Sequence, residues 1–367
     1  MKLRVFLMFC AIIATVNSCT SYDKGSDTEI IPFNKLQAMS YDDMHEGLSG
    51  KMEYTVLKAE SIEYMLTDVD KIIYKNNTFY IMDWINRKVV AFDKNGNPVL
   101  SLSKRGRGPG EYLQITDFDI DDNKDLWIVD GQNDLLLHYS NNCSFIDSRK
   151  LPFEVSYIKC IKGGMLFFGL SPWNTSDYKG KKILLSDTAL NIRKSMLIYD
   201  KFVDPNYSFP SFGFTDQNGS VLYHQPINDN VYKIDNEGEV KKIYNFDFGS
   251  RTVPDKFKKN IELYRDEFEN LRTLVKSVYI DESVIIGSVL QGREIKDFIV
   301  DRKREKLYLQ NEDYKGLCFM GVSDGNIIYR LVPGTQISMD FLPEEILSNM
   351  DKGNEVLALV KIGSIFR

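Results

Sequence analysis

Cations and glycines alternate in one short loop of this sequence. Residues 104–112 read Lys-Arg-Gly-Arg-Gly-Pro-Gly-Glu-Tyr. Glycine permits positive φ angles and close backbone approach, and arginine forms bidentate hydrogen bonds with carboxylate or sulfate groups. One interpretation is an anion site for an acidic sugar, with Arg105, Arg107, Glu111 and Tyr112 as the candidate ligand-binding residues.

The same loop also has a structural interpretation, which we favour. Pro109 and the glycines would fix a tight path between two strands, and Glu111 would pair with an arginine. A phosphate-binding loop is not supported, because Gly106, Gly108 and Gly110 lack the dinucleotide spacing and no Gly-Lys-Ser/Thr follows.

Aromatic side chains on loops could stack on sugar rings. Trp84 and Trp173 are therefore further candidates for ligand binding, and Trp173, in a Ser-Pro-Trp-Asn loop, is the better of the two.

Two aspartates occur in matching contexts, Asp83 in YIMDW and Asp130 in WIVDG. They could be paired carboxylates for acid-base chemistry at the rim of a tunnel. A residue that recurs in every repeat more often closes a turn, and we favour that interpretation.

An oxygen-rich run superficially matches a calcium loop. Asp119, Asp121, Asn123 and Asp125 alternate, and Asp130 falls at the twelfth position. However, lysine stands where such a loop needs glycine, and the run lies between two strand-like segments, so a β-hairpin is favoured.

The three histidines, His45, His138 and His224, differ in their positions relative to the repeats. Zinc binding or histidine-based catalysis would need two or three of them to converge. The sequence therefore predicts no catalytic residue, no metal site and no cofactor.

These residues are carried by short strand-like runs that recur together with turn residues. Asp83 and Asp130 are 47 residues apart (130 − 83), and repeated units start near residues 79, 126, 165, 221 and 284. Repeats of this size, rich in β-branched and aromatic residues, predict a β-propeller. We expect a sixth unit to combine residues 356–366 with residues 52–74, so that strands from both ends of the chain close the ring.

One segment departs from the β pattern. Residues 254–278 carry apolar side chains at spacings of four and three, with charges between them, which predicts an amphipathic helix inserted in the propeller. It could pack on the propeller or form a lid. Residues 343–350 are expected to form a second, smaller helix.

The N-terminus has the pattern of a secretory signal peptide. Lys2 and Arg4 precede an apolar run, residues 5–14, and the run ends in small or polar residues before Cys19. The Val-Asn-Ser-Cys end resembles a bacterial lipobox, so we expect residues 1–18 to be removed and Cys19 to be lipidated; an ordinary signal peptide is the alternative. A transmembrane anchor is not expected, because it would need about twenty apolar residues and the run at residues 5–14 is too short.

Residues 19–50 are expected to be a tether and a polar stretch before the propeller domain at residues 51–367. Residues 20–29 contain three acidic and no aliphatic side chains up to Glu29, so they should stay extended. The expected location is the cell envelope, lipid-anchored in the outer membrane, and the acidic tether resembles signals for surface display. The periplasmic face is the alternative.

The net charge restricts the possible partners of the chain, and the number of cysteines restricts its possible disulfides. Loss of Lys2 and Arg4 takes the formal net charge from −6 to −8, which argues against sequence-independent nucleic-acid binding. Three cysteines remain after Cys10 and Cys19, and they allow one disulfide, for which Cys143 and Cys160 are the nearest pair.

The chain resembles a known family over its first two repeats. The similarity is dense over residues 62–131, and its most specific mark is the Gly-x-Gly-Pro-Gly-Glu segment that starts at Gly106. The family is that of the six-bladed β-propeller lipoproteins of gut-type Gram-negative bacteria. Membership implies an all-β, six-bladed fold and an exported, lipidated chain whose molecular role is mostly unassigned.

We therefore expect a non-enzymatic binding or scaffold protein, anchored to the membrane by its lipid. The partner would be a glycan or another envelope protein. The alternative is a propeller hydrolase or lyase with a tunnel carboxylate or calcium site that uses Asp83 or Asp130.

Overall fold

The computed structural model describes residues 26–201, 204, 213–217, 219–276, 278–292, 294–310, 316–332 and 342–366. The predicted signal peptide and the predicted lipidation site, Cys19, lie outside the described residues. Within the described part, no helix is both long enough and apolar enough to cross a membrane.

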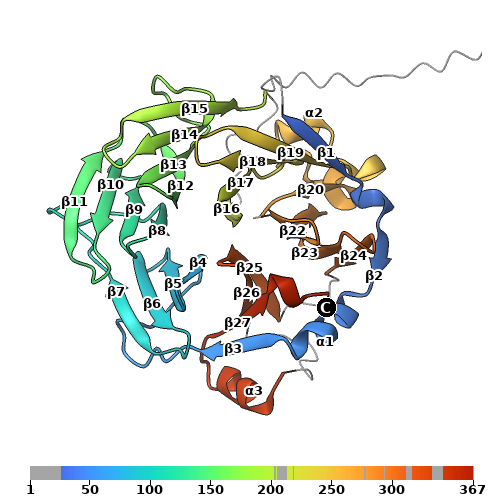
Figure 1. Cartoon of the computed structure of the whole chain (residues 1–367), viewed down its shortest axis with the longest axis horizontal. Coiled ribbons are helices and arrows are strands. Elements are labelled where there is room, and N and C mark those ends of the chain that lie inside the picture. The colour runs from blue at the N-terminus through green and yellow to red at the C-terminus, as the bar shows by residue number, and fades with distance from the viewer. Residues whose placement is uncertain are drawn as a thin grey trace, which may run out of the picture.

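Six β-sheets are arranged as blades around a central axis (Figure 1). In each of the first three blades, four antiparallel strands follow one another from the axis to the rim. Blade 1 holds β4 (Lys71–Lys75), β5 (Thr78–Asp83), β6 (Lys88–Asp93) and β7 (Pro98–Leu102); blade 2 holds β8 (Asp117–Ile120), β9 (Leu126–Asp130), β10 (Leu135–Tyr139) and β11 (Phe145–Lys150); blade 3 holds β12 (Val155–Ile161), β13 (Met165–Leu170), β14 (Lys181–Asp187) and β15 (Ile192–Ile198).

The other three blades each include a strand from near the N-terminus. Blade 4 holds β16 (Phe214–Gln217), β17 (Ser220–His224), β18 (Asn230–Asp235), β19 (Val240–Phe246) and β1 (Asp27–Ile31); blade 5 holds β20 (Arg272–Leu274), β21 (Tyr279–Ile280), β22 (Val284–Gln291), β23 (Glu294–Asp301), β24 (Lys306–Leu309) and β2 (Gln37–Met39); blade 6 holds β25 (Leu317–Ser323), β26 (Asn326–Leu331), β27 (Val356–Lys361) and β3 (Met52–Val56).

The N-terminal strands form a strap along the rim, which we define as residues 27–39. Within it, β1 pairs in parallel with β19, and β2 pairs in parallel with β24 (Figure 1). The strap covers two outer strands whose backbone groups would otherwise be unpaired. Farther along the chain, β3 pairs antiparallel with β27 as the outermost strand of blade 6. The polar stretch predicted before the propeller is thus part of its rim.

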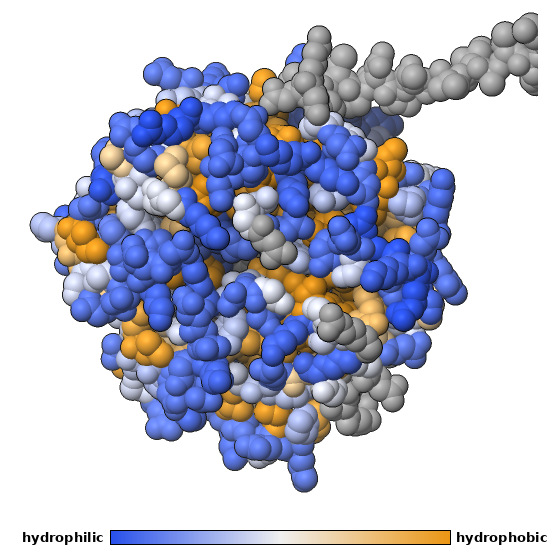
Figure 2. Space-filling model, viewed as in Figure 1, coloured by the Kyte–Doolittle hydropathy of each residue, from blue (hydrophilic) through white to orange (hydrophobic). Residues whose placement is uncertain are grey.

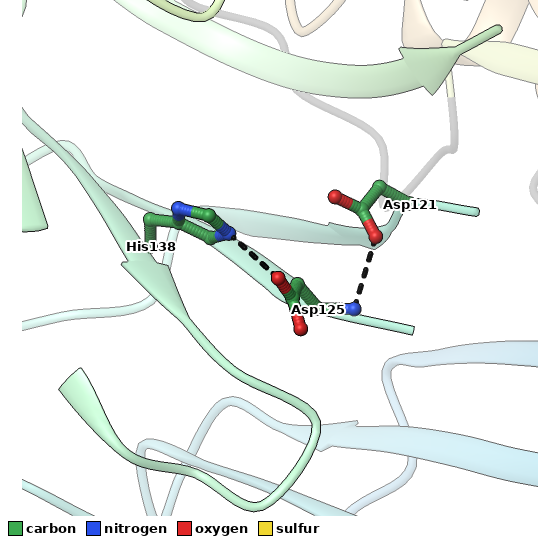
Figure 3. Close-up of side chains that lie close together, drawn as sticks. All are labelled: Asp121, Asp125 and His138. Carbon is green, nitrogen blue, oxygen red and sulfur yellow. Dashed lines mark hydrogen bonds and ion pairs between the residues drawn. The ribbon is translucent and has the colours of Figure 1, made fainter. Parts of the chain in front are cut away.

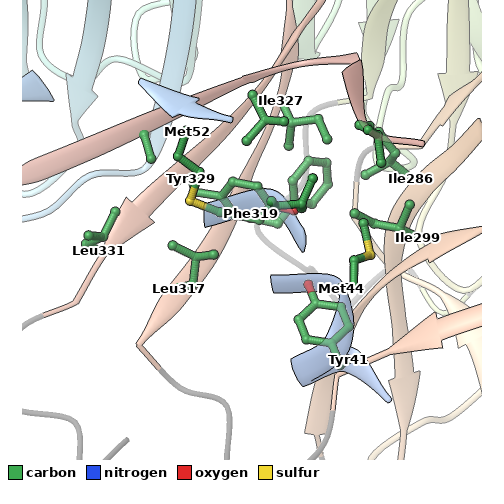
Figure 4. Close-up of a cluster of buried hydrophobic side chains, with 14 of the residues drawn as sticks. Tyr41, Met44, Met52, Ile286, Ile299, Leu317, Phe319, Ile327, Tyr329 and Leu331 are labelled. Atoms are coloured by element: carbon green, nitrogen blue, oxygen red, sulfur yellow. The ribbon is translucent and has the colours of Figure 1, made fainter. Parts of the chain in front are cut away.

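Apolar side chains fill the space between neighbouring blades, which explains why inner strands read as nearly continuous apolar runs. One cluster joins blades 1 and 2 through residues such as Met82, Phe118 and Ile128. Another joins blades 5 and 6 and includes Tyr41 and Met44 of α1 (Tyr41–Ser49), as Figure 4 shows.

Antiparallel pairing divides the connections between two faces of the propeller. The turn face carries the turns between first and second strands and between third and fourth strands. The loop face carries the connections between second and third strands and those from one blade to the next. Residues 84–87 and 171–180 therefore lie on the loop face, and the connection 103–116 starts and ends there, while Lys104 and Gly110 within it reach Cys143 and Tyr139 beside the β10–β11 turn of blade 2.

The predicted helix at residues 254–278 is wrong. The segment forms a short α2 (Asp255–Lys258), the 3-10 helix η3 (Arg265–Asn270) and then strand β20. Its apolar side chains are nevertheless buried together, in a cluster with Val253, Ile227 and Leu290. Turns can direct these side chains to one side as a helix would, and the pairing of β20 with β22 competes with helix formation. The smaller helix is present as α3 (Glu344–Asp351).

The repeat starts predicted from the sequence coincide with the second strand of each blade, so each blade begins one strand earlier. The expected sixth unit is also corrected: residues 71–75 form the first strand of blade 1, and blade 6 takes β25 and β26 instead. The candidate disulfide does not form, because Cys143 lies in the outer β10–β11 turn of blade 2 and Cys160 on the innermost strand of blade 3.

Candidate functional site

The glycine-rich basic loop is a tightly bonded connection between blades 1 and 2. Gly106 N donates to Tyr112 O at 3.0 Å, and Tyr112 N donates to Lys104 O at 3.0 Å. The Tyr112 ring is fully buried, with its hydroxyl 2.9 Å from Arg87 O and 3.0 Å from Leu102 O. Tyr112 is therefore a core residue of this connection, out of reach of a ligand on the surface.

Glu111 folds back over the loop rather than pairing with an arginine. Its Oε2 accepts a hydrogen bond from Gly108 N at 2.8 Å. A β-carbon at Gly106 would lie 1.9 Å from the same oxygen, so glycine is needed there. The structural interpretation therefore accounts for the glycines, but its predicted pairing of Glu111 with an arginine is wrong, because the Glu111 carboxylate accepts the backbone N–H of Gly108.

Arg105 and Arg107 are the exception within the loop. Both are exposed, and neither guanidinium forms a hydrogen bond or ion pair with any part of the chain that the structure describes. These two cations are free to meet an anion from solution.

Two adjoining segments at the loop face of blade 1 carry exposed apolar side chains, which we call the apolar patch: Ile62, Met65, Trp84 and Ile85. Their exposed fractions are 86%, 50%, 52% and 55%. Figure 2 shows that hydrophobic side chains on the face in view form separate patches within a mainly hydrophilic surface. Exposed apolar groups that cluster in this way mark binding surfaces more often than isolated ones do.

Hydrogen bonds hold the backbone under this apolar patch. Lys88 Nζ donates to the carbonyls of Glu63 at 3.0 Å and Met65 at 2.5 Å. Asn86 Nδ2 donates to Thr67 Oγ1 at 2.7 Å, which ties the segment before β4 to the β5–β6 turn. The patch is thus built on a fixed backbone.

The apolar patch and the basic loop adjoin each other. The buried Tyr112 hydroxyl contacts Arg87 O in the turn that carries Trp84, and Gln114 Nε2 donates to Trp84 O at 3.5 Å. An exposed indole and two free guanidinium groups are therefore carried by neighbouring loops.

Trp173 is also exposed, at 55%, in the loop between β13 and β14. It lies on the same face of the propeller, but on blade 3, so that blade 2 separates it from the apolar patch. Trp84, Arg105 and Arg107 are thus carried by two connections that adjoin at Tyr112 and Gln114, whereas Trp173 is on a separate blade.

Asp83 and Asp130 are turn clamps. Both are fully buried. Asp83 accepts Thr67 N at 2.8 Å and Asn86 Nδ2 at 2.7 Å, while Asp130 accepts Leu113 N and Asn133 Nδ2, both at 2.8 Å. The alternative of tunnel acid-base carboxylates is wrong for these two residues, because both end the second strand of a blade and their oxygens are occupied by backbone and amide donors.

The calcium-loop alternative also fails, because its oxygens diverge. Asp119 accepts Cys160 N at 2.6 Å near the axis, and Asp121 accepts Asn123 N at 2.8 Å within the hairpin turn. Asp130 lies at the other end of β9. The run forms a β-hairpin, as favoured from the sequence.

The innermost strands line a channel that ion pairs cross between blades. Lys71 of blade 1 pairs with Asp117 of blade 2 at 2.7 Å, and Asp117 accepts Ile158 N of blade 3 at 2.8 Å. Lys159 lies 3.1 Å from Asp119 and 2.8 Å from Asp216. Burial raises the pKa of the Asp117 carboxyl, and the neighbouring Lys71 ammonium opposes that shift. Charges in the channel are therefore engaged with each other.

A cavity of about 270 Å³ opens at the turn-face end of this channel. Its lining mixes both signs of charge, with Lys75, Lys162, Asp122 and Asp324 among the residues. Among the described residues, no three carboxylate, imidazole or thiol groups converge on the axis closely enough to hold a metal ion.

Comparison with known proteins identifies the family. A family model, DUF5128, described as a 6-bladed beta-propeller, matches residues 21–286. The chain belongs to the DUF5128 family.

Solved structures similar to this DUF5128 protein share its fold. A Bacteroides fragilis protein described as exported aligns with a TM-score of 0.69 and 20% identity, over 92% of this chain and 99% of its own. A member of the DUF4221 family from Bacteroides vulgatus aligns with a TM-score of 0.55 and 10% identity, over 84% and 96%. No curated protein matches the chain in sequence.

Several residues of this DUF5128 protein could not be assigned from sequence. Ile62, Met65 and Ile85 look like ordinary core positions until the fold shows them exposed. The channel also contains charged side chains, namely Lys71, Asp117 and Lys159. Only Asp117 had a signal in the sequence, because aspartates alternate in DFDI, on an innermost strand.

Proposed function

We propose that this protein is an exported, lipid-anchored, non-enzymatic binding protein of the cell envelope whose loop face binds an acidic glycan. The observation that carries the proposal is that adjoining loops carry an exposed Trp84 and two unengaged guanidinium groups, Arg105 and Arg107.

The chemistry of this site suits a sugar that carries carboxylate or sulfate groups. The indole ring offers a flat apolar surface for the C–H face of a sugar ring. Arginine offers a planar fork of donors that matches carboxylate and sulfate oxygens. Neither guanidinium has to give up an internal partner on binding, which keeps the cost of engagement low.

The strap supports a particular orientation on the membrane. β1 begins at Asp27, opposite Lys242 near the start of β19, and β19 leaves the turn face of blade 4. A tether from Cys19 would join the propeller on its turn face. The loop face, with Trp84, would then point away from the lipid.

Catalysis in the channel has less support. Asp117 and Asp119 are held by lysines and by backbone N–H groups of blade 3. The clamps Asp83 and Asp130 accept backbone and amide donors at the outer ends of their strands. A carboxylate that must accept or deliver a proton needs a position from which it can reach a substrate.

A partner protein is the second candidate ligand, and the aliphatic part of the apolar patch favours it. Ile62, Met65 and Ile85 are side chains that protein interfaces bury, whereas sugar binding makes little use of them.

A glycan array tests the proposal. We expect the mature protein to bind uronic-acid or sulfated glycans and to lose that binding on Trp84→Ala and in an Arg105→Ser/Arg107→Ser double variant. Arg193→Ser, an exposed arginine on β15 of blade 3, is the matched control and should leave binding unchanged. An array without any signal would favour a protein partner. Fractionation of a Cys19→Ala variant tests the anchor, and unchanged membrane association would contradict it.

A further inference from the structure

Three side chains of blade 2 converge on the turn face, where the β8–β9 turn meets β10. Asp121 and Asp125 come from the turn and His138 comes from the strand (Figure 3). One ligand atom from each lies within 4.8 Å of the other two. His138 Nε2 is 3.2 Å from Asp125 Oδ2.

These separations fit the coordination sphere of a small divalent ion. Ligand atoms at about 2.1 Å from a metal are about 3.0 to 3.4 Å apart at the angles of octahedral and tetrahedral sites. The Asp125–His138 distance already falls in this interval. A metal ion would replace the hydrogen bond between them without moving the strands, and Asp121 would need only a small side-chain adjustment.

The carboxylates are oriented by donors that a metal would not displace. Trp127 Nε1 donates to Asp121 Oδ2 at 3.1 Å, and Asn141 N donates to Asp125 Oδ1 at 3.0 Å. Asp121 Oδ2 and Asp125 Oδ1 each keep a further lone pair, whereas Asp121 Oδ1 already accepts both Asn123 N and Asp125 N. Such outer hydrogen bonds fix first-sphere ligands in known metal sites.

The imidazole is fixed as well. His138 lies opposite Trp127 in the β9–β10 register, and the two rings stack with centroids 3.9 Å apart and an angle of 11° between their planes. Stacking holds the ring plane while leaving the Nε2 edge directed at Asp125.

The ligand types select the class of metal. Calcium and magnesium prefer sites built only from oxygen, whereas an imidazole beside carboxylates suits Zn²⁺, Co²⁺, Ni²⁺ and Cu²⁺. The His138 and Asp125 side chains keep exposed fractions of 15% and 17%, so water can complete the coordination sphere. We propose that Asp121, Asp125 and His138 form a binding site for a divalent transition-metal ion such as Zn²⁺.

This site differs from the calcium loop considered from the sequence. It omits Asp119 and Asp130, and it recruits His138 from the next strand. An ion bound here would join the β8–β9 turn to β10 and would brace the turn face of blade 2, independently of ligand binding on the loop face.

The test is calorimetric titration of Zn²⁺ into the purified full-length protein, made without a histidine tag and freed of metals by chelator. We expect one ion per chain. His138→Gln and Asp125→Asn should each weaken binding by at least about tenfold, and Trp127→Phe, which keeps an aromatic ring but removes the indole donor, by about tenfold. Co²⁺ bound at the same place should quench the fluorescence of Trp127.

Asp93→Asn is the matched control. Asp93 closes a similar turn in blade 1, accepting Asn95 N at 2.8 Å and Asn97 N at 2.9 Å, but its hydrogen bonds include none from a histidine. Zn²⁺ affinity should be unchanged in this variant. The proposal is overturned if the folded wild-type protein binds no Zn²⁺, or if folded Asp125→Asn and Trp127→Phe variants bind it as tightly as the wild type does.

Discussion

The Glu111 carboxylate occupies the space that a β-carbon on Gly106 would need, because the two atoms would be 1.9 Å apart. This contact explains why glutamate closes the Gly-x-Gly-Pro-Gly-Glu segment: its carboxylate caps the backbone at Gly108. The motif therefore fixes the path of the connection between blades 1 and 2. The two arginines in the motif take no part in these contacts and remain available for binding.

Packing of the same connection against blade 2 predicts that alanine substitutions at two glycines differ strongly in their cost to stability. Gly110 has φ +72° and a β-carbon there would lie 2.6 Å from Phe145 Cγ, whereas Gly164 has φ +70° and open space around it. Gly164→Ala should cost about 1 kcal/mol of unfolding free energy for the strained backbone, and Gly110→Ala about 1 to 3 kcal/mol more for the clash. Urea unfolding measures both; equal costs would contradict the interblade contact.

The turn clamps predict a loss of stability rather than of activity. Asp130→Ala removes the acceptor of Leu113 N and Asn133 Nδ2 inside the protein, so the free energy of unfolding should fall by about 3 kcal/mol. Asp122→Ala, on a side chain that is 67% exposed, should change it by less than about 0.5 kcal/mol. Similar values for the two variants in denaturant titrations would show that Asp130 is not a clamp.

A buried histidine gives the stability a specific pH dependence. Burial lowers the pKa of His224 from 6.5 to about 4, and its Nε2 lies 2.8 Å from Asn228 O. Between these two pKa values the imidazole binds a proton in the unfolded chain but not in the folded one. The contribution of His224 to the free energy of unfolding is therefore complete above pH 6.5, and the free energy falls by about 3 kcal/mol as the pH drops to 4.

The variant His224→Gln separates this contribution from other acid effects. Glutamine can still donate to Asn228 O but does not titrate, so unfolding measured from pH 7 to pH 4 should show a shallower decline than in the wild type. A decline of the same slope would assign the acid sensitivity to other groups.

The strap should contribute to stability through one buried ring. Phe33 packs against Phe248 and Phe298, with ring centroids 5.0 Å away in each case. Phe33→Ala should cost about 3 to 5 kcal/mol. Ile30→Ala, on the same strap but 63% exposed, should cost less than about 0.5 kcal/mol. Thermal and urea unfolding of both variants check this, and a neutral Phe33→Ala would mean that the strap does not support the blades.

The repeat pattern made most of the blades predictable from the sequence. The second strand of a blade, such as β5 or β9, is buried on both faces and ends at a clamping aspartate, so its pattern is strong. The strap was missed because β1 pairs in parallel with a strand more than two hundred residues away, and short polar strands of this kind carry little periodicity.

The predictions that failed did so through tertiary context. The 254–278 segment has helical spacing, yet Thr273 of β20 bonds to Asp229 Oδ1 at 2.7 Å and Ile261 N to Asp204 Oδ2 at 3.2 Å. Such contacts hold the backbone in turns and a strand. Exposure could not be predicted either. The exposed Trp84 directly after β5 and the buried Trp127 within β9 both adjoin similar apolar strand sequences.

The most direct test of loop-face recognition is calorimetric titration of the mature protein with an acidic oligosaccharide such as oligogalacturonate. We expect saturable binding that Trp84→Ala weakens at least tenfold, or about 1.4 kcal/mol, and that the Arg105→Ser/Arg107→Ser variant weakens while also reducing its dependence on salt. Binding of equal strength in the wild type and both variants would contradict a site at Trp84, Arg105 and Arg107.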